Sequence, residues 1–157
     1  MLDSRLRAYI DPPLSAIGRA LARIGIGADE MTLAGFVAGA TAAVAIVFRQ
    51  FEIAILLIVI GRIADGLDGA IARATRLTDR GGFLDIALDF FFYGLIPLAF
   101  ALADPFRNGL AAAVLLASFY FNGAAFLAYA IMAEKRGLKS EAQGQKSLYY
   151  VAGLAEG

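Results

Sequence analysis

Long apolar stretches alternate with short polar connections along this chain. Met31–Phe48 carries no formal charge and is nearly long enough to cross the bilayer core. Gly82–Ala103 and Asn108–Ala133 are similarly apolar, and Phe51–Thr75 is apolar apart from charged residues that interrupt it. The pattern therefore predicts four transmembrane helices.

Both ends of the chain predict a further element. After Pro12 and Pro13, apolar residues recur on one helical face, at Leu14, Ile17, Leu21 and Ile24. Because proline starts a helix but does not fit inside one, we expect a short amphipathic helix to follow this pair and lie on the membrane surface. A helix packed against other protein would show the same pattern. At the other end, Leu148–Gly157 is typical of the opening of a fifth span.

These elements predict an all-α fold: a polytopic membrane helix bundle with an N-terminal amphipathic interfacial helix, four complete transmembrane helices and the start of a fifth. The 157 residues suffice for a single domain, covering 1–157. Because the last predicted helix has only begun where the sequence stops, we expect this domain to be incomplete at its C-terminus.

Composition supports the membrane assignment and narrows the chemistry. Hydrophobic residues make up 60% of the chain and charged residues 18%, an apolar excess that lipid can solvate. The net charge is zero, so bulk charge does not indicate a nucleic-acid partner. The absence of cysteine and histidine excludes thiolate and imidazole chemistry. Carboxylates, hydroxyls, amines and guanidinium groups remain.

Basic residues are distributed unequally between the two sides of the predicted bundle. Ten lie beside the N-terminal helix, in the connection after Thr75 and after the fourth span, whereas only Arg49 and Arg107 lie on the opposite side. By the positive-inside rule, the N-terminus and the connection after Thr75 face the cytoplasm. We expect a bacterial inner (plasma) membrane protein whose acidic residues open toward the cytoplasm.

Four aspartates flank the connection between the second and third spans. Asp65 and Asp68 are three residues apart, and Asp85 and Asp89 are four apart, so each pair shares one face of a helix. A short connection makes the two helices antiparallel neighbours. We therefore expect the four carboxylates to surround one pocket.

The cost of burying these charges favours a functional reason for them. A charge at the centre of a transmembrane helix costs about 2.5–3.5 kcal/mol on insertion scales. Pairing of Asp65 and Asp68 with Arg62 and Arg73, or a solvated helix N-terminus for the other pair, would be structural alternatives. Clustered carboxylates repel unless cations or protons neutralise them. An all-oxygen site suits Mg²⁺ or Mn²⁺, and two such ions would suit displacement at phosphorus.

The same segment resembles the signature of the CDP-alcohol phosphatidyltransferase family, D-x2-D-G-x2-A-R-x(7–9)-G-x3-D-x3-D. Eight positions match, at Asp65, Asp68, Gly69, Ala72, Arg73, Gly81, Asp85 and Asp89. The resemblance implies six transmembrane helices, a homodimer, and transfer of a substituted phosphate from CDP-diacylglycerol or another CDP-alcohol to a small alcohol acceptor, with release of CMP.

Roles for individual residues follow from the resemblance alone. It implies that Asp65, Asp68 and Asp85 hold the metal ions, with Asp89 also near them and acting as the general base. The remaining matches would contact the donor: Gly69, Ala72, Arg73 and Gly81. Two weaker similarities place Thr32 near the donor and Lys146 near a phosphate.

Other classes of function predict different behaviour. Intramembrane aspartates also mark ion pathways, so a transport protein is the main rival. An inactive binding subunit would bind CDP without turnover, and a phosphohydrolase would release CMP without an acceptor. The identity of the acceptor, the acyl-chain preference and the choice between Mg²⁺ and Mn²⁺ are not determined by the sequence.

Overall fold

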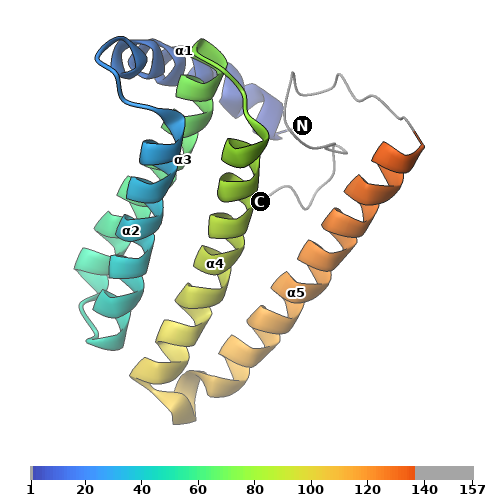
Figure 1. Cartoon of the computed structure of the whole chain (residues 1–157). Helices are drawn as coiled ribbons and strands as arrows, with labels where there is room; N and C mark the ends of the chain where they lie inside the picture. The colour runs from blue at the N-terminus through green and yellow to red at the C-terminus, as the bar shows by residue number, and fades with distance from the viewer. Residues whose placement is uncertain (1, 137–157) are drawn as a thin grey trace.

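The computed structural model describes residues 2–136, which form five α-helices and their connections (Figure 1). The helices are α1 (Leu2–Arg23), α2 (Ala28–Val47), α3 (Phe51–Ala74), α4 (Asp79–Ala103) and α5 (Pro105–Lys135). This arrangement confirms the all-α fold. The predicted opening of a further span at Leu148–Gly157 lies outside the described residues.

Three helices, α2, α4 and α5, are long and apolar enough to cross a membrane. The fourth predicted span corresponds to α3, whose residues 53–61 are apolar and which carries charged residues from Arg62 onward, in what we call its charged half. The charged half of α3 adjoins the connection to α4. Each of α3 to α5 runs antiparallel to its predecessor, so this connection and the start of α2 lie at the same end of the bundle (Figure 1).

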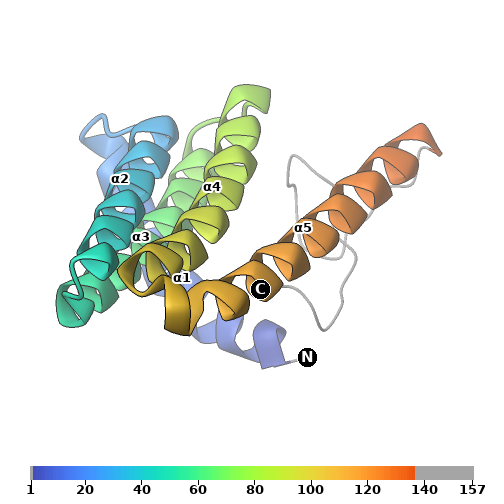
Figure 2. The same ribbon diagram turned by 90° about the horizontal axis from the view of Figure 1, so that it is seen from below.

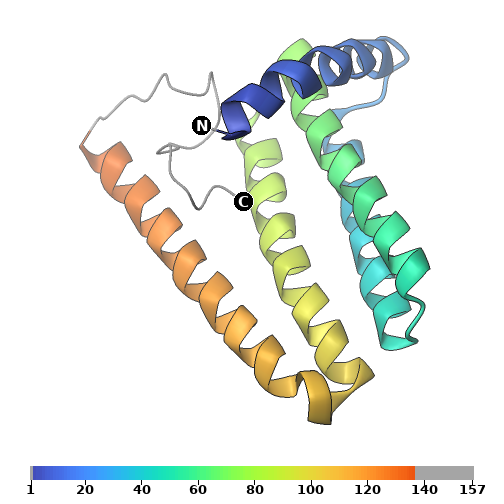
Figure 3. The same cartoon turned by 180° about the vertical axis from the view of Figure 1, so that it is seen from behind.

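Helix α1 lies across that end of the bundle rather than along it (Figure 3). It packs on α3, where a Cβ added at Gly18 would come within 2.7 Å of the Ala70 Cβ. Ile17 of α1 and Ile24, the residue that follows the helix, stay exposed, at 48% and 74%. One part of α1 therefore packs on protein, while exposed apolar side chains remain available to lipid, as an interfacial helix requires.

The expected start of the first helix after the two prolines is wrong. Helix α1 begins at Leu2 and contains both Pro12 and Pro13. A proline removes one backbone hydrogen bond from a helix. Both prolines are exposed. The φ angle of proline, fixed at about −65°, is compatible with a helix, so the helix can continue through the pair despite the lost bonds.

Small residues allow α2 and α3 to pack closely. A Cβ added at Gly61 would lie 3.1 Å from the Gly35 carbonyl oxygen, and one added at Gly35 would lie 3.2 Å from the Ala64 Cβ. Close backbone approach through glycine is typical of membrane helix pairs. This contact fixes the rotation of α2 relative to the charged half of α3.

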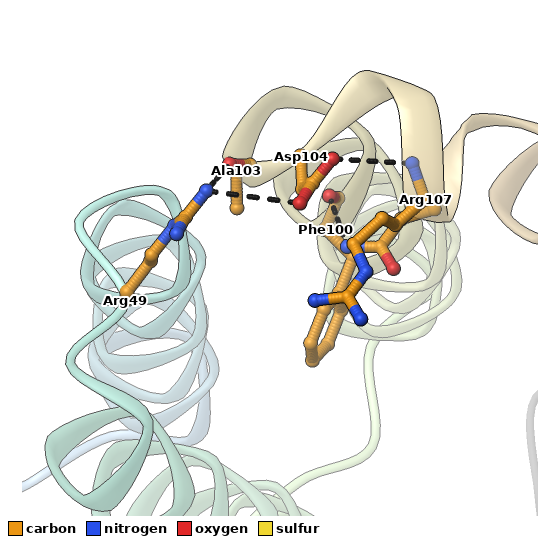
Figure 4. Close-up of polar contacts among 6 residues, drawn as sticks. Arg49, Phe100, Ala103, Asp104 and Arg107 are labelled. Carbon is orange, nitrogen blue, oxygen red and sulfur yellow. Dashed lines mark hydrogen bonds and ion pairs between the residues drawn. The ribbon is translucent and has the colours of Figure 1, made fainter.

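A polar cluster joins the two turns at the opposite end of the bundle (Figure 4). Arg49, which has a positive φ of 60°, donates from Nη2 to the Ala103 carbonyl oxygen at 3.0 Å. It also forms an ion pair of 3.8 Å with Asp104, whose side chain caps α5 by accepting from the Arg107 backbone N–H. The turn after α2 is thereby attached to the turn after α4.

Helix α5 is the outermost of the described helices. It packs on α4, which separates it from the α2–α3 pair (Figure 2). At Gly123 the two helices approach so closely that an added Cβ would meet the Phe90 ring. The acidic residues therefore belong to the α2–α3–α4 part of the bundle.

Candidate functional site

The charged half of α3 presents two aspartates one turn apart. Asp68 is only 5% exposed, whereas the Asp65 side chain is 32% exposed. Ionised carboxylates are seldom buried without a partner that offsets their lost hydration. The burial of Asp68 therefore makes its partners important.

Helix α4 supplies the second pair. Its N-cap is Thr78, whose hydroxyl accepts a hydrogen bond of 3.0 Å from the Gly81 backbone N–H. The helix thus begins at Asp79, before the Gly82 start that hydropathy indicates. Asp85 and Asp89 follow on successive turns; the former is exposed and the latter partly buried.

Three of the four carboxylates converge. Asp65, Asp68 and Asp85 each offer one oxygen, and these oxygens lie within 4.8 Å of one another. The two helices therefore bring together three of the four carboxylates that were expected to share one pocket. Asp89 lies one turn further along α4 and is not part of this group.

Thr32 of α2 contacts the most buried member of the group. Its hydroxyl donates a hydrogen bond of 2.6 Å to Asp68 Oδ2, and Thr32 is itself only 8% exposed. The backbone carbonyl of Ala28 lies 3.0 Å from the same hydroxyl. A third helix therefore contributes to the acidic site. Thr32 does lie beside the motif, although its predicted contact with a donor remains a prediction.

Asp89 is paired with an arginine of α3. Arg62 Nη2 lies 3.0 Å from Asp89 Oδ1, and Arg62 Nη1 lies 3.6 Å from Asp65 Oδ2. One guanidinium group thus contacts both acidic pairs. The sequence offered Arg62 as a partner for Asp65 and Asp68; the structure adds Asp89, which is 27 positions away.

The remaining motif residues lie around the opening of the site. The Arg73 guanidinium is close to Gly69, where an added Cβ would come within 3.2 Å of Nη1. Arg73 is exposed and Ala72 is half-buried. A Cβ at Gly81 would lie 3.2 Å from Asp29 Oδ1. Gly69 and Gly81 are therefore closely approached by neighbouring polar side chains, and the contacts of these four positions with a donor remain predictions.

Sequence reasoning missed one link at this end of the bundle. The sequence gives no evident role to Arg80, but its Nε forms an ion pair of 3.3 Å with Asp29 Oδ2. The pair joins the starts of α2 and α4. The opposite charges were visible in the sequence, but no spacing rule connects residues on different helices. Lys146 lies outside the described residues.

The donor set fits a hard divalent cation. All three converging groups are carboxylates, and the chain contains no histidine or cysteine that would favour a softer metal. Three carboxylate oxygens at this separation repel one another, and a cation among them would remove that repulsion. The Asp65–Asp68–Asp85 group is therefore a candidate metal site.

A cavity lined by both polar and apolar residues adjoins this group between α2, α3 and α4. Its lining includes the carboxylates of Asp65, Asp85 and Asp89 together with the rings of Phe36 and Phe92. The cavity therefore places acidic and aromatic residues side by side next to the acidic group.

Comparison with known proteins identifies relatives of the whole chain. The family model described as "CDP-alcohol phosphatidyltransferase" matches residues 26–154. The "Inner membrane protein YnjF" of Escherichia coli is 45% identical over 157 residues, which is 100% of this chain and 76% of that protein. No solved structure matches the chain.

Two archaeal relatives match about half of the chain. The "Archaetidylinositol phosphate synthase" of Pyrococcus horikoshii is 36% identical over 87 residues, covering 55% of this chain and 46% of that protein. The protein of the same name from Aeropyrum pernix is 35% identical over 88 residues, covering 55% and 45% respectively.

Proposed function

This chain belongs to the CDP-alcohol phosphatidyltransferase family, which makes it a membrane transferase of phospholipid biosynthesis, and we propose that it moves a phosphatidyl group from CDP-diacylglycerol or another CDP-alcohol to a small alcohol, releasing CMP. The observation that carries the proposal is the convergence of three aspartate oxygens within 4.8 Å. Residues 1–157 would act as one catalytic domain.

Asp65, Asp68 and Asp85 would hold divalent cations, Mg²⁺ or Mn²⁺, and we assign two ions with Asp89 at the edge of their site. When bound, the cations neutralise the diphosphate of the donor and favour departure of CMP. The burial of Asp68 and its hydrogen bond from Thr32 support this assignment, because they hold one ligand oxygen in a fixed direction.

Asp89 would be the general base. It takes the proton of the acceptor hydroxyl while that oxygen forms a bond to the phosphorus that carries the lipid. The bond between this phosphorus and the bridging oxygen breaks, and CMP leaves with both electrons. A carboxylate is the suitable base in a chain without histidine. The position of Asp89 beside the metal group, rather than within it, supports a separate role.

The donor would lie along the exposed end of α3. Gly69 and Ala72 would allow its nucleotide to approach the helix. Arg73 would contact its phosphates, and the family resemblance implies the same role for Lys146. Gly81 and Thr32 complete the donor side. The exposed guanidinium of Arg73 supports this arrangement, since guanidinium groups bind phosphate oxygens in pairs.

The membrane setting is a further part of the proposal. We propose a homodimer in the bacterial inner membrane, with its N-terminus and active site facing the cytoplasm. The relative in Escherichia coli is named as an inner membrane protein, and α1 lies at the end of the bundle that contains the acidic site. The archaeal relatives are named for an inositol phosphate product, so a phosphorylated polyol is the first acceptor to test.

CMP release from CDP-diacylglycerol in liposomes, with Mg²⁺ or Mn²⁺ and a panel of alcohols, tests this proposal. The panel contains inositol phosphate, glycerol phosphate, serine and choline. We expect release that depends on one acceptor and stops when a chelator is added. Release that is independent of every acceptor would indicate a phosphohydrolase. Ion flux in liposomes without any nucleotide dependence would indicate a transporter.

A further inference from the structure

Arg62 is the side chain that connects the two functions assigned to the acidic cluster. It extends from α3, one turn before Asp65, and its two terminal nitrogens contact different carboxylates. Nη2 lies 3.0 Å from Asp89 Oδ1, while Nη1 lies 3.6 Å from Asp65 Oδ2. One end of the guanidinium fork therefore contacts the proposed metal group and the other contacts the proposed base.

The Arg62 guanidinium is itself held in place. Its central carbon lies 4.7 Å from the centre of the Phe92 ring, and Phe92 is on α4 one turn after Asp89. Arg62 Nε is buried without a hydrogen-bond partner among residues 10–136. The Arg62 side chain as a whole is 38% exposed, so its position depends on these contacts, the stacking of a cation on an aromatic ring and its attraction to nearby carboxylates. The ring and the two carboxylates thus define one orientation of the fork.

This orientation separates Asp89 from the other three aspartates. Asp65, Asp68 and Asp85 bring oxygens within 4.8 Å of one another, and Asp89 is outside that group. A carboxylate at the edge of a cation site would otherwise turn toward the cations. With Oδ1 bound by Arg62, the second oxygen of Asp89 is the one available for a proton.

We propose that Arg62 is a positioning residue that holds Asp89 away from the metal group and directs its second carboxylate oxygen toward the acceptor hydroxyl. This inference rests on the proposed function, because it assumes that Asp89 is the base. It adds a residue outside the eight matching positions of the family signature. The reaction step itself is unchanged: the proton passes from the acceptor oxygen to Asp89 as the new oxygen–phosphorus bond forms.

A simpler role for Arg62 would be to neutralise the charge of the carboxylates. Substitution by lysine distinguishes this role from the positioning of Asp89. Arg62→Lys keeps the positive charge but has a single ammonium group, which cannot occupy both positions of the planar fork. If the charge alone mattered, the lysine variant would work as well as the native protein. If the fork positions Asp89, the charge is insufficient.

The experiment compares Arg62→Lys and Arg62→Gln with the native protein in the CMP-release assay, together with Mn²⁺ and CDP binding. We expect Arg62→Gln to lower kcat by about 100-fold, the scale of a misplaced catalytic group, and Arg62→Lys to lower it by roughly 10-fold. The KM for the donor and the Kd for Mn²⁺ should change by less than about threefold. Combining Arg62→Gln with Asp89→Asn should be no slower than Asp89→Asn alone, because both act on the same base.

Arg49→Gln is the matched control, since Arg49 also pairs with an aspartate but at the opposite end of the bundle. It should leave kcat unchanged. Full activity of Arg62→Lys would overturn the positioning role, as would a loss in Arg62→Gln that saturating Mn²⁺ restores. If Arg62→Gln does not fold, the lysine variant decides the question. An inactive native protein would instead overturn the proposed function.

Discussion

Thr32 donates a hydrogen bond of 2.6 Å to Asp68, joining α2 to the most buried carboxylate of the acidic site. The two residues are 36 positions apart in the sequence. Their contact depends on the close packing of α2 on α3, where Gly35 and Gly61 bring the backbones together. The site is therefore built from three helices, although the signature residues lie on two.

Thr32→Val removes the hydroxyl while keeping the shape of the side chain. Without this donor, Asp68 loses its fixed orientation, and second-shell changes of this kind weaken metal binding by about 10–100-fold. We expect a weaker Kd for Mn²⁺ and a higher Mn²⁺ requirement for CMP release. Thr32→Ser, which keeps the hydroxyl, should bind Mn²⁺ like the native protein. Equal affinity in the valine and serine variants would contradict this role.

The acidic residues should separate into two phenotypes. Asp89→Asn should lower the rate of transfer by at least about 100-fold, because an amide cannot take the proton of the acceptor hydroxyl. It should largely preserve CDP-diacylglycerol binding. Asp65→Asn should instead impair Mn²⁺ binding. Measuring donor binding and Mn²⁺ binding on both variants checks the division, and near-native turnover by either one would argue against the site.

Close helix packing predicts a position-dependent cost for added side-chain volume. Gly61→Ala places a methyl group 3.1 Å from the Gly35 carbonyl oxygen, whereas Gly94→Ala meets nothing within 4 Å among the described residues. We expect the former to destabilise the protein by about 1–3 kcal/mol and the latter to have little effect. Thermal unfolding in detergent measures both. A common Tm for the two variants would show that α2 and α3 are not tightly packed.

The polar cluster at the other end should affect stability without affecting chemistry. The Arg49 side chain is 65% exposed, so its ion pair with Asp104 is screened by solvent. Arg49→Ala should therefore lower the free energy of unfolding by less than about 1 kcal/mol. The rate of CMP release per folded molecule should stay the same. A large loss of activity would mean that the two ends of the bundle are coupled.

The helices and the acidic pairs were predictable because local rules determine them. Apolar stretches of suitable length predicted α2, α4 and α5, and helical spacing placed Asp65 with Asp68 on one face. The short connection to α4 was sufficient to bring Asp85 near them. The comparisons confirm the family indicated by this spacing.

Contacts between helices were not predictable in the same way. The spacing gave no reason to prefer Asp89 as a partner of Arg62, because that choice depends on how α3 and α4 rotate about their axes. The ion pair between Arg80 and Asp29 has the same origin. The start of α1 differs from the expectation for another reason: proline is unfavourable inside a helix, but its fixed φ angle is compatible with one, and α1 continues through both prolines.

Binding of Mn²⁺ by the native protein and by Asp68→Asn and Asp85→Asn tests the central claim most directly. Electron paramagnetic resonance of free Mn²⁺, measured in the presence of CDP, reports binding without requiring turnover. The three-carboxylate site predicts tight binding by the native protein and a loss of at least about tenfold in each variant, because each removes one charged ligand. Native affinity in both variants would show that the converging aspartates of α3 and α4 do not hold the metal.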